Sequence, residues 1–169
     1  ISPTLVVPAD VNFRVDVNSG TYHDQRWFTV HIDQRMLDLD VNQVRITVVN
    51  NGRRGSTDVS APQGRGIQYR NVQHCGEAGL MVGTGPSQVS NCVFDTTGYD
   101  LHFRPENAIR YLGYPGIDQH ATVHLNDSAA GALRLGVGIK ETAFEFTSAE
   151  LQGSVFLNYQ ITNRSLTGF

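Results

Sequence analysis

Short apolar segments separated by polar turns recur along the middle of the chain, from Val44 to Phe103, at an interval of about 21 residues. Each unit has an apolar strand, an asparagine, a glycine-containing or polar turn and a second short apolar strand. Segments this short predict β-strands, and no helical period longer than about two turns carries both start and stop signals. The positions that fall in step are Ile46 with Ile67, Asn50 with Asn71 and Asn91, and Val59 with Leu80 and Leu101.

The interval restricts the architecture. A unit of this length cannot bury its own apolar face or hold the helix of a leucine-rich or ankyrin repeat, so the units must stack on one another. The pattern predicts a parallel β-helix, an all-β solenoid in which equivalent strands of successive coils pair at a spacing of roughly 4.8 Å. Asn50, Asn71 and Asn91 would then form an amide ladder at one corner. The alternative is that asparagine is common in turns of any kind.

The segments "IQYRNVQHCGEAGLMV" and "SQVSNCVFDTTGYDLHF" resemble the right-handed parallel β-helix proteins, which include pectate-lyase-like polysaccharide-degrading enzymes and bacteriophage tailspikes. The resemblance implies a right-handed solenoid and a carbohydrate-directed function, most like a tailspike that binds and degrades bacterial surface polysaccharide as a glycosidase or a lyase. The alternatives are a non-catalytic glycan-binding adhesin and a structural fibre or shaft segment. The resemblance also implies an extracellular or virion-associated location.

The flanking regions are less regular than the repeat. Residues 1–41 contain the alternating segments "VNFRVDV" and "WFTVHID", which predict strands in early coils or in an N-terminal cap. Residues 42–106 would form the regular coils, and residues 107–169 a loop excursion followed by irregular coils or a C-terminal β cap. Because the ends of a solenoid expose unpaired backbone, they must be capped or joined to a neighbour. The tailspike resemblance implies that the neighbour is the same chain, in a parallel homotrimer.

Composition supports the all-β class and excludes two kinds of partner. Seventeen glycines and only 17 % charged residues are more typical of β structure than of a helical bundle. Thirteen basic and sixteen acidic residues give a net charge of −3, so we expect no nucleic-acid partner. No apolar run approaches the ~18 residues of a membrane span, so we expect no membrane insertion. Cys75 and Cys92 fall in different columns of the repeat, which favours two reduced cysteines, with a disulfide as the alternative.

Acidic side chains on the outer face of the coils are the first candidates for catalysis. Glu77 and Asp95 lie in the turn after the asparagine on neighbouring coils, so stacking would bring their carboxyl groups within several ångströms. A pair of carboxylates is what glycoside hydrolysis requires, one as acid and one as base or nucleophile. Asp95 with Asp100 is the second candidate pair. The alternative is that these residues are solvated turn residues.

An elimination mechanism needs a base to remove the proton α to a uronate carboxyl group and a cation to stabilise the resulting enolate. Strand alternation sends Asp100, His102 and Arg104 to the outer face of the predicted coil. His102 or Tyr99 would then be the base and Arg104 the cation. The alternative is a solvent-exposed strand face without a catalytic role.

We expect neither a metal site nor a cofactor. His120 and His124 in "HATVH" would share one face of a strand, but no spacing in the chain matches a closed zinc site. No acidic cluster is dense enough to predict calcium.

Sugar recognition without catalysis is a separate hypothesis. Trp27, Tyr99, Tyr111 and Tyr114 could stack on sugar rings, and Arg104 could hydrogen-bond to sugar hydroxyl groups. The alternative for the tyrosines of the loop "RPENAIRYLGYPG" is packing against the body of the protein. In either case the expected partner is a bacterial polysaccharide.

Overall fold

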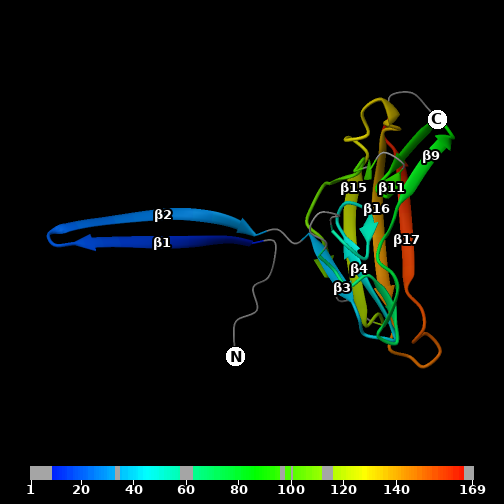
Figure 1. Ribbon diagram of the computed structural model, residues 1–169, viewed down its shortest axis with the longest axis horizontal. Helices are drawn as coiled ribbons and strands as arrows, with labels where there is room; N and C mark the ends of the chain where they lie inside the picture. The colour runs from blue at the N-terminus through cyan, green and yellow to red at the C-terminus, as the bar shows by residue number, and fades with distance from the viewer. Residues whose placement is uncertain are drawn as a thin grey trace. The chain divides into compact units, whose positions relative to one another are not determined.

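The computed structural model describes residues 9–32, 35–57, 63–95, 98–99, 101–111 and 116–165, and its strands are drawn in Figure 1. The chain divides into two units, Ile1–Gln34 and Arg35–Phe169. Apart from the 3-10 turn η1 (Gly131–Leu133), every regular element in the described residues is a β-strand. The all-β prediction is therefore confirmed.

The first unit contains one long antiparallel hairpin, formed by β1 (Ala9–Ser19) and β2 (Tyr22–Ile32). Ser19 pairs with Tyr22, so the turn has two residues, and its first residue, Gly20, has a φ of +60°. Glycine adopts this conformation without steric cost, which suits the tight turns that connect twisted strands. The segment "VNFRVDV" lies in β1 and "WFTVHI" in β2, so the strands that alternation predicted in this region are confirmed.

The second unit contains a six-stranded antiparallel sheet, which we call the β4 sheet. Its strands lie in the order β7-β6-β4-β5-β8, and β3 also pairs with β4. The strands are β3 (Met36–Leu39), β4 (Val44–Val49), β5 (Arg53–Arg54), β6 (Ile67–Tyr69), β7 (Val72–Cys75) and β8 (Ala78–Gly79).

A five-stranded antiparallel sheet, which we call the β15 sheet, packs against the β4 sheet. Its order is β13-β15-β16-β17, and β14 also pairs with β15, so β17 is an edge strand. The strands are β13 (Arg104–Pro105), β14 (Arg110–Tyr111), β15 (Gln119–Asn126), β16 (Val137–Glu145) and β17 (Phe156–Asn163). Two short hairpins complete the unit: β9 (Met81–Gly85) with β10 (Gln88–Asn91), and β11 (Phe94–Asp95) with β12 (Gly98–Tyr99).

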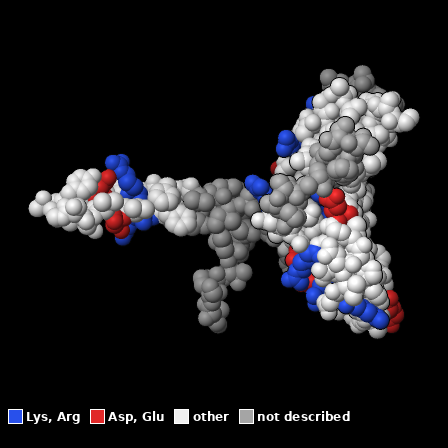
Figure 2. All heavy atoms as spheres, in the orientation of Figure 1, with Lys and Arg blue, Asp and Glu red and all other residues white. Residues whose placement is uncertain are grey.

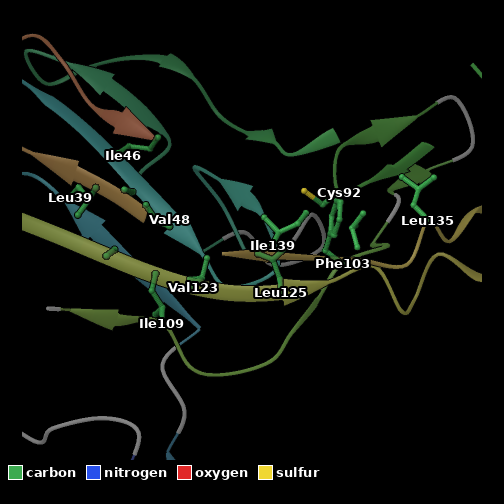
Figure 3. Close-up of a cluster of buried hydrophobic side chains, with 13 residues drawn as sticks. Leu39, Ile46, Val48, Cys92, Phe103, Ile109, Val123, Leu125, Leu135 and Ile139 are labelled. Carbon is green, nitrogen blue, oxygen red and sulfur yellow. The ribbon is translucent and has the colours of Figure 1, made fainter. Parts of the chain in front are cut away.

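The core lies between these two sheets, and strand alternation builds it. Along β15, Ala121, Val123 and Leu125 are buried on the same side of the strand because successive side chains point to opposite faces. Figure 3 shows side chains from several elements meeting in this cluster. The labelled members are Leu39, Ile46, Val48, Cys92, Phe103, Ile109, Val123, Leu125, Leu135 and Ile139.

The prediction of a parallel β-helix is wrong, and the resemblance to tailspikes and pectate-lyase-like enzymes is wrong with it. Ile46 and Ile67, which the repeat placed in step, are indeed neighbours, but in antiparallel strands. Val44 pairs with Tyr69, whereas a parallel coil would keep every partner at the same interval along the chain. Strands and turns of similar length produce a regular interval in antiparallel as well as in parallel sheets. The interval of about 21 residues therefore reflects strands that reverse direction at turns.

The asparagine ladder is also wrong, because the three asparagines have separate local roles. Arg70 and Asn71, with φ of +49° and +66°, form the two-residue turn between β6 and β7. Asn50 is buried at the end of β4, and the Asn91 side-chain oxygen accepts the N–H of Val93 at 3.0 Å. Asparagine tolerates left-handed backbone and hydrogen-bonds to nearby N–H groups, so turn chemistry explains all three positions.

A buried carboxylate organises the connection between β15 and β16. Asp127 is fully buried and accepts the backbone N–H groups of Leu135, Gly136 and Val137 at 2.5, 3.1 and 3.0 Å. The Ser90 hydroxyl donates to the same carboxylate at 3.1 Å. Three backbone donors that would otherwise be buried without an acceptor are satisfied by this one side chain.

We expect Asp127→Ala to lower the free energy of unfolding by about 3 kcal/mol or more, because it leaves several buried donors unpaired. Urea unfolding of the two proteins measures this difference. Asp118→Ala is the matched control, since Asp118 accepts the N–H of Thr147 at 2.7 Å but is exposed. A loss in the Asp127 variant no larger than in this control would contradict the assigned role.

Glu145, at the end of β16, is a second buried carboxyl group, and it is less well compensated. Its Oε2 accepts the N–H of Val41 at 3.1 Å, and the side chain is fully buried. Burial raises the pKa of Glu145 from its ordinary 4.5 to about 7, and the nearby Asp40 carboxylate acts in the same direction. The folded protein therefore holds a proton on Glu145 at pH values where the unfolded chain has released it.

Stability should fall as pH rises through this window. A pKa raised by folding contributes stability that is complete below about pH 4.5 and is lost as the pH rises through about 7. We expect the stability of the native protein relative to Glu145→Gln to fall by about 2 to 3 kcal/mol between roughly pH 5 and pH 8. Denaturant unfolding of both proteins across this range tests it, and a difference that does not vary with pH would refute it.

Candidate functional site

A cleft of about 310 Å³ lies on the face of the β15 sheet that points away from the core. Strands β14, β15 and β16 form its floor, and Asn107 and Ile117 contribute to its wall. Its lining residues are Asn107, Arg110, Ile117, His120, Thr122, His124, Lys140 and Thr142.

Strand register explains why these side chains meet. His120, Thr122 and His124 alternate with the buried apolar residues of β15, so they all point to the outer face. In the antiparallel pairing Thr122 lies between Arg110 of β14 and Thr142 of β16. Opposite residues in antiparallel strands point to the same face, so the three strands present one common surface.

The charge of the cleft is positive. Arg110 and Lys140 are cationic, His120 and His124 become cationic when protonated, and none of the described lining residues is acidic. His124 and Lys140 are direct cross-strand partners, so the imidazole and the ammonium group lie on the same face of neighbouring strands. An anionic group in the cleft would be attracted to the Arg110 and Lys140 charges.

Neutral hydrogen-bonding groups lie among the basic ones. The Thr122 hydroxyl and His120 Nε2 are 3.3 Å apart. Asn107 Oδ1 accepts the backbone N–H of His124 at 3.3 Å, which holds the asparagine side chain against β15. Hydroxyl and amide groups in this position can bond to a neutral polar ligand group as well as to a charged one.

An aromatic cluster continues the same face of the sheet beyond His120. Phe144 is the cross-strand partner of both His120 and Phe156, so its ring lies on the cleft side of the sheet. The Phe144 and Phe156 rings stack, with their centroids 5.4 Å apart and an interplanar angle of 9°. Phe146 meets both rings edge to face. Phe156 is an exposed member of this cluster, which gives the face an apolar platform beside the basic cleft.

The expected placement of His120 and His124 on one strand face is confirmed, but they cannot share a metal ion. They are four residues apart on an extended strand, which separates their Cα atoms by roughly 13 Å. The described part of the chain contains no group of three or more His, Cys, Asp and Glu residues placed to hold a metal. It also contains no helix long and apolar enough to cross a membrane.

The acidic residues proposed for hydrolysis do not form a pair in the manner expected. Glu77 forms an ion pair with the buried guanidinium of Arg53, and Cys75 Sγ lies 2.8 Å from its backbone oxygen. Asp95 ends β11, in a different sheet from the strands beside Glu77. Asp100 lies outside the described residues. Only the stacked coils of a solenoid would have placed Glu77 beside Asp95, and the structure has no such coils in its described residues. The catalytic roles of the two residues stay untested.

The histidine and arginine proposed for elimination are also separated from the cleft lining. His102 Nδ1 accepts the backbone N–H of Asn91 at 3.1 Å, which gives it a structural contact with the end of β10. Arg104 is exposed on β13, opposite Asn126. Their proposed roles are untested predictions.

The aromatic residues proposed for sugar binding are dispersed over separate elements. Trp27 is exposed on β2 in the first unit, and the Arg14 guanidinium lies 5.8 Å from its ring centroid. Tyr99 lies in β12 and Tyr111 in β14, where Tyr111 pairs with Ala121. Tyr114 lies outside the described residues. Their proposed role in sugar binding is an untested prediction.

A second group of titratable side chains is buried between the sheets. Arg54 of β5 forms an ion pair with Glu141 of β16 and donates to the Tyr159 hydroxyl at 3.0 Å. Burial raises the pKa of Glu141, and the Arg54 charge opposes that rise. Both partners are almost fully buried, so this cluster has a structural role.

The two cysteines are free thiols, as expected. Cys92 is buried, and burial raises the pKa of its thiol to about 11, so it remains protonated and packs as a small apolar side chain. Cys75 is exposed.

The sequence predicts only part of the cleft. The alternation of "HATVHL" indicates that both histidines share a face, and this signal was present. Nothing in the sequence placed Lys140, the single lysine, opposite His124, or Arg110 beside Thr122. Those contacts depend on the strand pairing, which local patterns do not determine.

Fold and site together define an all-β protein with two packed antiparallel sheets and a basic cleft on the outer face of one of them. Comparisons with protein-family models, with curated proteins and with solved structures gave no match. The function must therefore be argued from the site itself.

The buried ion pair supplies a test of the structural role of the second cluster. We expect Glu141→Ala to lower the free energy of unfolding by about 3 to 5 kcal/mol, because Arg54 would remain buried without its partner. The double variant Arg54→Met with Glu141→Leu should recover most of this loss. Glu106→Ala, which breaks the exposed pair with Arg164, is the control and should cost less than about 1 kcal/mol. Equal losses in the single and double variants would contradict the coupling.

Proposed function

We propose that this protein binds an anionic carbohydrate in the basic cleft of the β15 sheet. One observation carries the proposal: Arg110, His120, His124 and Lys140 converge on one cleft in which no described lining residue is acidic. Arg110 and Lys140 carry fixed positive charges on this surface. A carboxylate, sulfate or phosphate group on the ligand would form charge-assisted hydrogen bonds with them.

The neighbouring groups favour a sugar as the carrier of that charge. Thr122, Thr142 and Asn107 offer hydrogen-bonding groups suited to hydroxyl groups. The Phe144 and Phe156 rings lie on the same face and offer an apolar surface for a sugar ring. A ligand lying along β15 could therefore contact charged, polar and aromatic groups in succession.

An elimination reaction is a second candidate, and the pairing of His124 with Lys140 favours it. The histidine would remove the proton α to a uronate carboxylate while the lysine neutralises that carboxylate. The electron pair then forms a double bond to the β carbon, the bond from that carbon to the glycosidic oxygen breaks, and the leaving oxygen takes up a proton. Hydrolysis has less support, because it requires a carboxylate pair and no described lining residue is acidic.

Calorimetric titration with acidic oligosaccharides, their neutral counterparts and inorganic phosphate tests the binding proposal. We expect binding of the acidic sugars that weakens with added salt, because ion pairs in an open cleft are screened. Lys140→Gln and Arg110→Gln should each raise the Kd about fivefold, the equivalent of about 1 kcal/mol. Phe156→Ala should weaken sugar binding and leave phosphate binding unchanged. Absorbance of unsaturated uronates in the same mixtures reports elimination.

Arg104→Gln is the matched control, because Arg104 is an exposed arginine of the same sheet that does not line the cleft. It should leave the Kd unchanged. Equal binding of neutral and acidic oligosaccharides, or equal losses in the Arg104 and Arg110 variants, would overturn the proposal. Binding of phosphate alone would assign the cleft to a small anion and remove the sugar from the proposal.

A further inference from the structure

The β1–β2 hairpin has two faces of opposite chemistry, set by its strand pairing. On one face polar residues of β1 lie opposite mostly polar residues of β2. On the other face, apolar side chains of β1 lie opposite Phe28, Arg26 and Asp24. The polar face carries Asn12, Arg14, Asp16, Asn18, His23, Gln25, Trp27 and Thr29, and the other face carries Phe13, Val15, Val17, Asp24, Arg26 and Phe28.

The polar face is suited to water because its groups bond to one another across the strands. Gln25 Nε2 donates to Asp16 Oδ1 at 2.8 Å, and the Thr29 hydroxyl donates to Asn12 Oδ1 at 2.7 Å. The Arg14 guanidinium forms an ion pair with Asp16 at 2.9 Å. These contacts pair the polar groups of this face with one another, and the Arg14 guanidinium lies 5.8 Å from the centroid of the exposed Trp27 ring.

The apolar face is not covered in the same way. Phe13, Val15, Val17 and Phe28 are 44 %, 42 %, 46 % and 49 % exposed. The Phe13 and Phe28 rings stack on each other with their centroids 5.8 Å apart, which joins the two strands but leaves the outer ring surfaces open. A two-stranded hairpin is marginally stable by itself, and a contiguous apolar face on it marks an interaction surface.

The charges on this face indicate what covers it. Asp24 and Arg26 lie two residues apart on β2, opposite Val17 and Val15, and they form an ion pair at 3.0 Å. Figure 2 shows the acidic and basic side chains of the hairpin gathered in one short region, with uncharged atoms on either side. A surface that carries one acid and one base at adjacent positions is complementary to itself under two-fold rotation, which brings each base opposite the other copy's acid.

We propose that the hairpins of two copies of this chain pack with their apolar faces together, with Arg26 of each copy opposite Asp24 of the other. The occupant of the face is therefore a second copy, and the product is a two-layer sandwich of four strands. The apolar side chains of both hairpins become its interior, at the usual distance of roughly 10 Å between packed sheets. This pairing is independent of the ligand in the cleft, and the homotrimer implied by the tailspike resemblance stays an untested prediction.

Sedimentation equilibrium of the full chain tests the pairing. The native chain should form a dimer. Asp24→Lys makes the charges of the face all positive and Arg26→Glu makes them all negative, so each variant alone should dissociate at least tenfold more readily. An equimolar mixture of the two variants should recover dimers, because opposite faces now meet. No partner other than a second copy predicts this recovery.

Gln25→Lys is the control, because it adds a positive charge between the same two residues but on the polar face. It should dimerise like the native chain. Circular dichroism of each variant establishes that its β structure is kept, and Phe28→Ser should dissociate the dimer without altering charge. A native chain that remains monomeric, a mixture that fails to recover dimers, or a control that dissociates like Asp24→Lys would overturn the proposal. A monomeric chain that sediments with phospholipid vesicles would assign the face to a lipid surface instead.

Discussion

The ion pair between Arg54 and Glu141 is a buried polar contact between the two sheets, and it restricts how they can pack. Each residue lies on a different sheet and is almost fully buried, so neither charge is tolerable in the interior without the other. The pair therefore favours one alignment of β5 against β16 among the many that apolar packing would permit. The outward residues of β16, including Lys140 and Thr142, take their places in the cleft through the pairing of β16 with β15.

Strand β16 shows how one alternating segment supplies both structure and function. Ile139, Glu141 and Ala143 point inward to the core, whereas Lys140 and Thr142 point outward to the cleft. This division follows because successive side chains of a strand point to opposite faces. A shift of one residue in the pairing of β16 would therefore exchange its inward and outward residues. The core and the basic cleft are thus consequences of the same register.

The same principle accounts for the contrast between the β15 sheet and the β1–β2 hairpin. The β15 sheet has its apolar side covered by the β4 sheet and its polar side partly open, at the cleft. The hairpin has a polar side whose groups bond to one another and an apolar side around Phe13 and Phe28 that is exposed. An apolar face on a sheet is ordinarily packed against another layer, and this expectation is the basis for proposing a second copy on the hairpin.

The sequence by itself determined that the elements of this protein are strands and, for several of them, which residues share a face. Alternation in β1, β2 and β15, turn residues such as Asn71, and the common face of His120 and His124 all follow from local physical chemistry. The direction of pairing did not follow, because equal spacing of Ile46 and Ile67 is compatible with parallel coils and with antiparallel neighbours alike. Only the tertiary structure placed Lys140 beside His124 and Glu141 beside Arg54. Those contacts join residues of separate strands, so their geometry depends on how the whole chain packs. A local sequence pattern does not contain that information.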